Sequence, residues 1–329
     1  MDCNSSRKLK LLKIWEILKY KTNSEHPITT QELIGELQNL GICCERRTLY
    51  KDIDLLCRNG YDIVKGRSAH ENTYYTEKNE LSIPEIKIIM DAVQSVSFIP
   101  QDKTNELIAR LAGLSNCFRE ELLKKNTTRF HTVKHSNSDV YRNIDVIENA
   151  LEKKCFITFN YFHMNEYRER VYSHDKAIYH EQAVGTTFED GNYYLMCYRP
   201  KNAQYVNKIK VFRIDRIDNI KITGEKICKE AIDVLHDCER YKIQSFKMFG
   251  GNVQNVTLQF TPKLVEVIYD KFGYDLKIYR SGEFLYADIE VQISSTFWGW
   301  MLQFPVEMKI YKPQELQREY IKWVESALK

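Results

Sequence analysis

Two strand-like runs joined by a polar segment, between Gly191 and Ile217, constrain the fold of this chain more than any other stretch. The runs read NYYLMCY and KIKVFRIDRI. Apolar and charged residues alternate in the second run, which predicts a strand with Phe212 on one face and Arg213 on the other. By the same parity Arg213 and Arg216 leave opposite faces. Because an unpaired buried guanidinium is costly, each arginine needs a carboxylate, a solvated position or an anionic ligand.

Composition limits the class of protein. A length of 329 residues predicts two or three domains, and a net charge of +3 means that any nucleic-acid-binding surface must be local. The nine cysteines are scattered without zinc spacing, as is typical of reduced thiols in the cytosol. The start does not resemble a signal peptide, and no run approaches the roughly 18 apolar residues of a membrane span. We therefore expect a soluble cytoplasmic protein without a metal or another cofactor.

Three stripes of apolar residues at helical spacing precede Gly60, which predicts three helices. The stripes lie within residues 11–18, 33–40 and 49–57. Thr29 and Glu32 have the spacing of a capping box at the start of the second helix. Two strand-like runs then follow, at 61–65 and 72–76, and their connection carries His70. The order of elements predicts a helical head with a β-hairpin wing.

The third helix concentrates basic and hydroxyl side chains in its first turns. Such a helix fits the major groove of DNA, where arginine reads guanine edges and the other side chains hold phosphates. The residues predicted to contact duplex DNA are Arg46, Arg47, Thr48, Tyr50, Lys51, Lys65 and Arg67. The run ERRTLYKDIDLLCRNG resembles the winged helix-turn-helix of bacterial regulators. Residues 1–80 are therefore predicted to bind DNA, although helix-helix-helix-hairpin modules also occur in protein interaction.

Residues 81–150 are predicted to form a helical connector. Ser82 and Pro84 start one helix, a second runs from residue 105 and continues less regularly toward 123, and a third spans 139–151. Amphipathic helices behind a DNA-reading head often build a homodimer, which we expect here because paired heads enlarge the site read. A bundle folded back within one chain is the alternative.

Residues 151–226 contain short strand-like runs with tight turns, which predicts a small SH3-like or Sm-like β-barrel. The runs lie at 155–162, 167–174, 182–188, 193–198, 208–214 and 221–223. The motifs GNYYLMCY, FRIDRI and ITFNYF resemble those of the WYL domain, here with Tyr193 in place of its tryptophan. The resemblance implies a ligand sensor for an anionic molecule, such as a nucleotide or a single-stranded nucleic acid. The ligand-binding residues it implies are Tyr161, Tyr194, Tyr198, Arg213 and Arg216. Tyr194 and Arg213 are expected on different strand faces.

Residues 227–329 begin with a connecting helix and then predict the order β-α-β-β-α-β with a terminal helix, which is ferredoxin-like. The segment resembles the extension that follows WYL domains, including the run MFGG. We expect Phe297, Trp298 and Trp300 to form core or dimer packing rather than a base-stacking platform.

The sequence thus predicts a multidomain α+β protein that is not an enzyme, since it contains no nucleophile elbow, P-loop or dinucleotide fingerprint. The predicted function is a ligand-responsive transcriptional regulator that reads operator DNA and does not act at a membrane. The alternative is a single-stranded nucleic-acid-binding or accessory protein that acts mainly through the Sm-like barrel.

Overall fold

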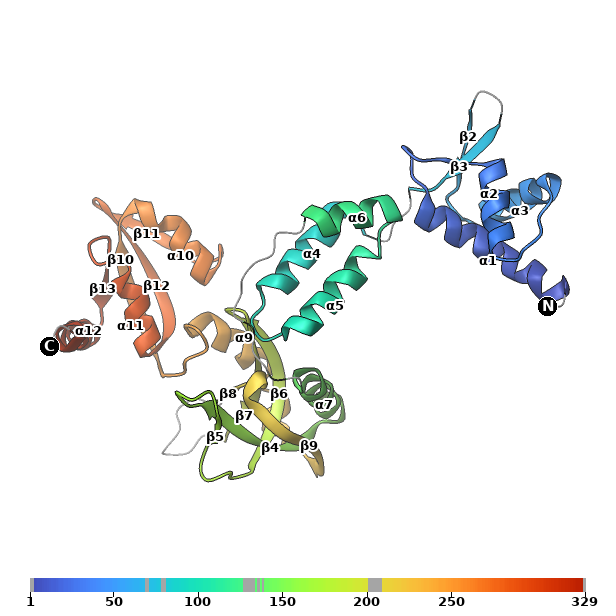
Figure 1. Cartoon of the computed structure of the whole chain (residues 1–329). Coiled ribbons are helices and arrows are strands. Elements are labelled where there is room, and N and C mark those ends of the chain that lie inside the picture. The colour runs from blue at the N-terminus through green and yellow to red at the C-terminus, as the bar shows by residue number, and fades with distance from the viewer. Residues whose placement is uncertain are drawn as a thin grey trace. The chain divides into compact units, whose positions relative to one another are not determined.

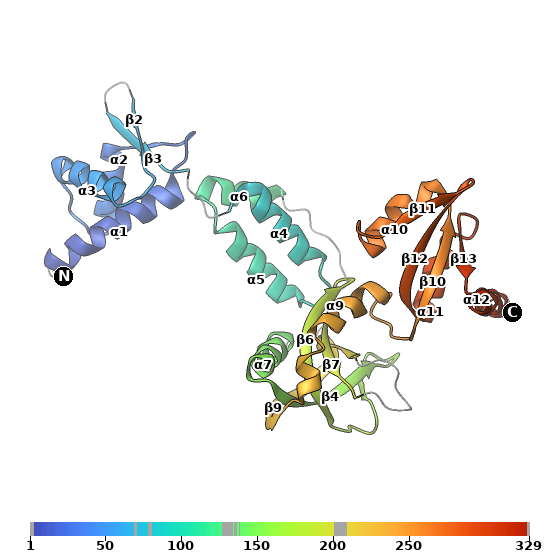
Figure 2. The same cartoon turned by 180° about the vertical axis from the view of Figure 1, so that it is seen from behind.

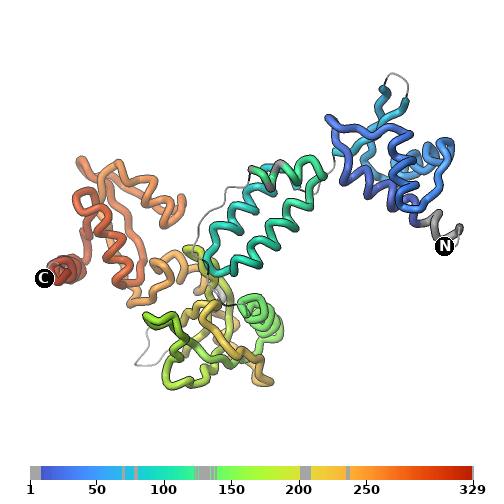
Figure 3. Tube along the Cα trace, viewed as in Figure 1, coloured from blue at the N-terminus to red at the C-terminus, as the bar shows by residue number. Residues whose placement is uncertain are grey.

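The computed structural model describes residues 3–68, 71–77, 81–126, 134, 137, 139–200 and 209–327. The chain divides into two compact units, Met1–Lys134 and His135–Lys329, and mixes helices with several antiparallel sheets (Figure 1). Figure 3 traces the path of the chain through each unit. Within the described ranges, no helix combines the length and the apolar character needed to span a membrane.

The head of the first unit consists of three helices and a small sheet. The helices are α1 (Cys3–Lys21), α2 (Thr30–Asn39) and α3 (Arg46–Arg58), and the strands are β1 (Ile28–Thr29), β2 (Val64–Arg67) and β3 (Asn72–Tyr75). Apolar residues of all three helices, among them Leu18, Leu33 and Ile53, form one core. The predicted capping box is confirmed, since Thr29 accepts from the backbone N–H of Glu32 while the Glu32 carboxylate accepts from that of Thr29.

The hairpin of the head is shorter than the sequence predicts at its first strand. Val64 pairs with Tyr75 and Arg67 with Asn72, so β2 begins three residues after the expected start. A side chain at Gly66 would meet the Thr73 hydroxyl at 2.7 Å, so only glycine fits there without a shift. An ion pair of 2.6 Å between Lys10 and Asp52, whose side chains are 9% and 16% exposed, joins α1 to α3.

Three helices follow the head in the first unit: α4 (Ile83–Ser95), α5 (Gln101–Ala112) and α6 (Cys117–Asn126). The expectation of one irregular helix from residue 105 toward 123 is wrong, because the chain turns at Gly113 and restarts at Cys117. Ser82 caps α4 with Glu85. The ammonium group of Lys134 donates to the carbonyls of Val93, Gln94 and Val96, which satisfies the end of α4. Part of the loop expected at 124–138 lies outside the described residues.

The second unit begins with α7 (Val140–Lys153), which packs against a half-barrel. Its strands are β4 (Cys155–Met164), β5 (Arg170–Tyr172), β6 (Tyr179–Glu189), β7 (Asn192–Tyr198), β8 (Ile209–Arg213) and β9 (Ile217–Lys226). They pair in the order β5-β4-β6-β7-β8, and β9 returns to β4. Ile147, Phe159 and Leu195 belong to the core between α7 and the sheet.

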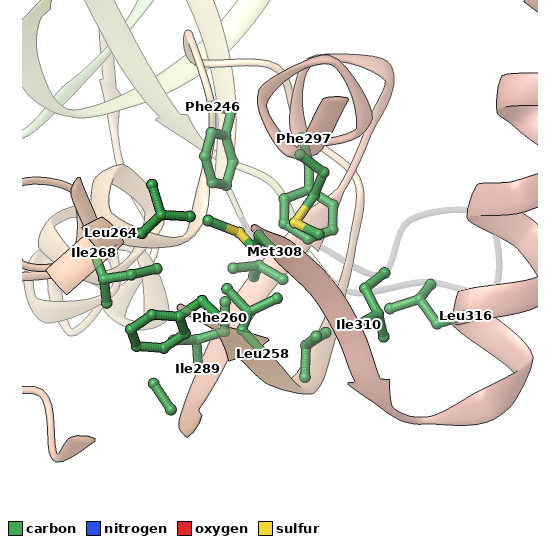
Figure 4. Close-up of a cluster of buried hydrophobic side chains, with 14 of the residues drawn as sticks. Phe246, Leu258, Phe260, Leu264, Ile268, Ile289, Phe297, Met308, Ile310 and Leu316 are labelled. Carbon is green, nitrogen blue, oxygen red and sulfur yellow. The ribbon is translucent and has the colours of Figure 1, made fainter. Parts of the chain in front are cut away.

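Two helices, α8 (Lys229–Ile232) and α9 (Leu235–Gln244), follow β9 and pack against the half-barrel. The rest of the second unit is a sheet whose core side is covered by helices. It contains β10 (Asn252–Phe260), α10 (Val265–Phe272), β11 (Ile278–Ser281), β12 (Phe284–Ile293), α11 (Ser295–Leu302), β13 (Met308–Lys312) and α12 (Gln314–Ala327). The strand order is β11-β12-β10-β13, antiparallel throughout, which is the order of a split β-α-β unit (Figure 2). Phe297 packs in its core with Phe246 and Leu258 (Figure 4).

Candidate nucleic-acid interface and anion site

The exposed face of α3 carries the polar residues that the sequence predicts for DNA contact. Leu49 and Ile53 lie one turn apart and are buried in the core of the head. Arg47, Thr48 and Lys51 occupy exposed positions of the same helix. The apolar stripe thus anchors α3 from behind, and its first two turns present cations and a hydroxyl to solvent.

Two ion pairs connect α3 with the hairpin. Arg46 pairs with Glu71 beyond the wing strand β2, and Lys65 of β2 pairs with Asp54. The hydrogen bond from Lys65 lowers the pKa of the Asp54 carboxyl and in turn raises the pKa of Lys65. Arg46 and Lys65 are therefore already partnered by carboxylates before any nucleic acid is bound.

The remaining predicted DNA contacts differ in exposure. Tyr50 is half-buried and packs against the core of the head, so its ring helps to seat α3. Arg67 is exposed at the end of β2, opposite Asn72. His70, expected near the tip of the wing, lies outside the described residues.

In the half-barrel, strand pairing brings three of the predicted ligand residues together. Tyr194 of β7 lies directly opposite Arg213 of β8, and the hydroxyl of Tyr161 on β4 accepts from the backbone N–H of Arg213 at 3.1 Å. The Arg213 guanidinium donates to both oxygens of Asp215, at 3.0 and 2.8 Å. The Asp215 side chain is only 5% exposed, so this is a nearly buried ion pair.

The expectation that Arg213 and Arg216 lie in one strand, on which their opposite faces were predicted, is wrong. The strand β8 ends at Arg213, and Ile214–Arg216 forms a 3-10 turn. Because Arg216 lies in the turn and Arg213 at the end of the strand, strand parity does not relate their side chains. Tyr194 and Arg213 also share a face rather than lying on different ones, since directly opposed residues of paired strands point to the same side.

The pKa shifts are consistent with two arginines close to the Tyr161 phenol. Burial raises the pKa of Tyr161, and the nearby Arg216 and Arg213 charges oppose that shift. Burial has the largest single effect on the pKa of Arg213 and would lower it, but the hydrogen bond and charge of Asp215, together with the nearby tyrosines, outweigh burial and raise that pKa. Arg213 is thus held charged by Asp215, whereas Arg216 makes no hydrogen bond or ion pair with a described residue. Because Arg213 is engaged by Asp215, the Arg216 guanidinium is the one of the two that is available to bind an external anion.

Tyr198 is not part of this group. It lies four residues along β7 from Tyr194, about 13 Å at the rise of a strand, and pairs with Ile209. Both Tyr194 and Tyr198 are buried, at 8% and 9% exposure, in a cluster with Met196 and residues of α9. Burial of its ring favours a packing role for Tyr198. Tyr194 is also packed, but its register places it beside Arg213.

Sequence reasoning missed an aromatic cluster on the opposite face of β8. The Lys210 ammonium lies 4.5 Å from the ring centroid of Tyr179 and 4.3 Å from that of Phe212, and it pairs with Glu181 at 2.8 Å. Tyr161 contacts the same Phe212 ring. Tyr179 was not recognised because the third strand was expected to start at Gln182. The available signal was that Lys210 and Phe212, two residues apart, share one face of the strand.

Comparisons with known proteins give little further information. No protein-family model matches the chain, and no curated protein matches it. Among the solved structures that match is proteasome accessory factor B/C (PafBC) of Arthrobacter aurescens, with 14% sequence identity and a TM-score of 0.31. The match covers 98% of this chain and 48% of that chain, so this chain spans about half the length of the solved one.

Proposed function

We propose that the chain is a DNA-binding transcriptional regulator whose head is a winged helix-turn-helix. The observation that carries the proposal is the exposed first half of α3, where Arg47 and Lys51 project beside the β2–β3 hairpin. A helix of this kind places its N-terminal side chains against base edges, and a neighbouring hairpin reaches the adjacent backbone. The sequence resemblance of this segment to bacterial regulators supports the same function.

The test is binding to duplex DNA selected from a random-sequence pool with the full chain. Replacing Arg46 and Arg47 together by alanine is expected to weaken binding and to reduce its salt dependence, since each lost phosphate contact lowers the slope by about one. Arg58→Ala is the matched control, because Arg58 is exposed at the far end of α3. Unchanged binding by the double variant, or an equal loss in the control, would refute this function.

We also propose that the half-barrel is a WYL-type sensor, and that the sheet behind it is a ferredoxin-like domain. The supporting geometry is the convergence of Tyr161, Tyr194, Arg213 and Arg216 at the end of β8. Two guanidinium groups beside a phenol suit a phosphate or another anion, which arginine holds with several donors at once. A nucleotide or a short single-stranded oligonucleotide meets these requirements.

In this proposal the ligand acts by preferring one arrangement of two heads in a cytoplasmic homodimer, which requires different affinities for the two arrangements. Thermal stability measured with added nucleotides or short oligonucleotides should rise for the native chain and not for Arg216→Ala. Lys221→Ala removes an exposed cation from β9 and is the control. A ligand response that survives Arg216→Ala would exclude this residue from the site.

A further inference from the structure

The sheet of the last domain has one face covered by helices and a second face that is open only in part, since Gln259 and Gln292 on it are 5% and 1% exposed. Leu258 and Ile289 are buried beneath the helices, at 0% and 5% exposure. Residues that alternate with them point to the other side, where Tyr279, Phe284 and Tyr311 are 47%, 39% and 47% exposed. Three large aromatic side chains on one sheet face are therefore accessible to a partner.

The register of the strands brings residues of this open face into a line. Lys309 pairs with Gln259, Gln259 pairs with Tyr286, and Tyr286 pairs with Tyr279, so all four strands contribute. The rings of Tyr279 and Tyr286 lie 5.6 Å apart and 14° from parallel. The Tyr311 ring contacts Tyr286 edge-on at 5.1 Å. The tyrosines thus form a continuous aromatic surface across the sheet.

Cations border this aromatic surface along β13. The Lys309 ammonium lies 6.0 Å from the Phe284 ring centroid, and the Lys312 ammonium lies 5.8 Å from that of Tyr311. Both lysines are exposed. Aromatic rings with a cationic rim provide π faces for stacking together with charges that suit a phosphate backbone.

Acidic residues of β12 lie on the same face as these lysines. The Asp288 carboxylate accepts from the Thr257 hydroxyl at 2.6 Å, and Glu290 pairs with Arg240 at 2.6 Å. Asp288 lies in the same row as Lys312, because both residues pair with Thr257. Burial, and after it the charge of Asp288, raises the pKa of Tyr279, so this carboxylate lies beside the aromatic surface, where Lys309 and Lys312 must offset its repulsion of an anion.

We propose that this open face binds single-stranded nucleic acid, with bases stacked on Tyr279 and Tyr311 and phosphates beside Lys309 and Lys312. Sheets that bind RNA use exposed aromatic side chains in this way, because unpaired bases offer their π faces. A duplex would use the lysines but not the rings, since its bases are already stacked on one another. A second copy of the chain is the other possible occupant, and the sedimentation measurement below detects it. This activity is separate from the proposed reading of duplex DNA by the head.

The experiment measures fluorescence anisotropy of labelled oligo(dT) and oligo(rU) with the full chain. Since one stacked base contributes about 1–3 kcal/mol, Tyr279→Ala and Tyr311→Ala should each weaken binding about 5- to 150-fold. Tyr311→Phe keeps the ring and should retain binding. Tyr274→Ala is the matched control, because Tyr274 is 82% exposed in the same domain but lies outside the sheet. Comparison of the two probes decides between DNA and RNA.

Cross-linking by ultraviolet light separates this surface from other binding sites on the chain. Cross-linked peptides should include Tyr279 or Tyr311, and duplex binding should be unchanged in both alanine variants. No binding of either oligonucleotide by the native chain, or equal binding by the alanine variants and the native chain, would overturn the proposal. So would a change in sedimentation of Tyr311→Ala without a loss of oligonucleotide affinity, which would identify the face as an interface between copies. Loss of duplex binding in Arg47→Ala tests the head alone.

Discussion

Neutralising Glu71 is expected to strengthen binding of duplex DNA through Arg46. The two side chains pair with 56% of Arg46 and 23% of Glu71 exposed. An exposed pair of this kind contributes under about 1 kcal/mol to stability, so a phosphate can displace the carboxylate. Glu71→Gln removes the competitor together with a negative charge that faces the DNA. We expect affinity to rise by up to about fivefold, the equivalent of that energy.

The neighbouring Arg47 provides the contrast. It makes no ion pair with a described residue, so it needs no partner exchange to reach DNA. Loss of a good arginine contact costs about 1–3 kcal/mol of binding free energy. The Arg47→Ala variant should lose this full amount. Arg46→Ala should lose less affinity, because in the native chain part of the free energy of the Arg46–DNA contact is offset by breaking the ion pair with Glu71. The expected order of affinity is Glu71→Gln, native chain, Arg46→Ala, Arg47→Ala.

The assay is anisotropy of a labelled duplex selected by the native chain, titrated between about 50 and 200 mM salt. Far-ultraviolet circular dichroism verifies that each variant is folded. Arg58→Ala, at the other end of α3, should match the native chain. Equal or weaker binding by Glu71→Gln, with an unchanged salt slope, would refute the view that Glu71 competes with DNA for Arg46.

Three further predictions concern stability, all measured by urea unfolding. Asp52→Ala should destabilise the head by about 3–5 kcal/mol, because it strands the Lys10 ammonium, whose side chain is 9% exposed; a loss below about 1 kcal/mol would contradict this. Asp215→Ala should destabilise the half-barrel by a similar amount, because Arg213 loses its carboxylate, and no loss would show that the pair is dispensable. Burial raises the pKa of Tyr241 from 10.0 to about 12. The stability this provides is complete below about pH 10 and disappears as pH rises toward 12, so Tyr241→Phe should flatten that fall by up to about 1.4 kcal/mol per pH unit; an unaltered profile would exclude Tyr241 as its source.

The sequence by itself determined the local elements of this protein. The capping boxes of Thr29 with Glu32 and of Ser82 with Glu85 depend on residues three positions apart. The apolar stripe of α3 likewise depends on spacing within one helix, and it left Arg47 on the outer surface. Such features follow from helix geometry, so they can be deduced without knowing what the helix packs against.

Only the tertiary structure decided how distant residues meet. The 3-10 turn after Arg213 brought Arg216 toward Tyr161 and overturned the strand parity. The pairing of Arg46 with Glu71, and the aromatic surface built from three strands, required contacts between residues that are far apart in sequence. Register depends on turn geometry and on the packing of both sheet faces together, and no window of sequence contains that information.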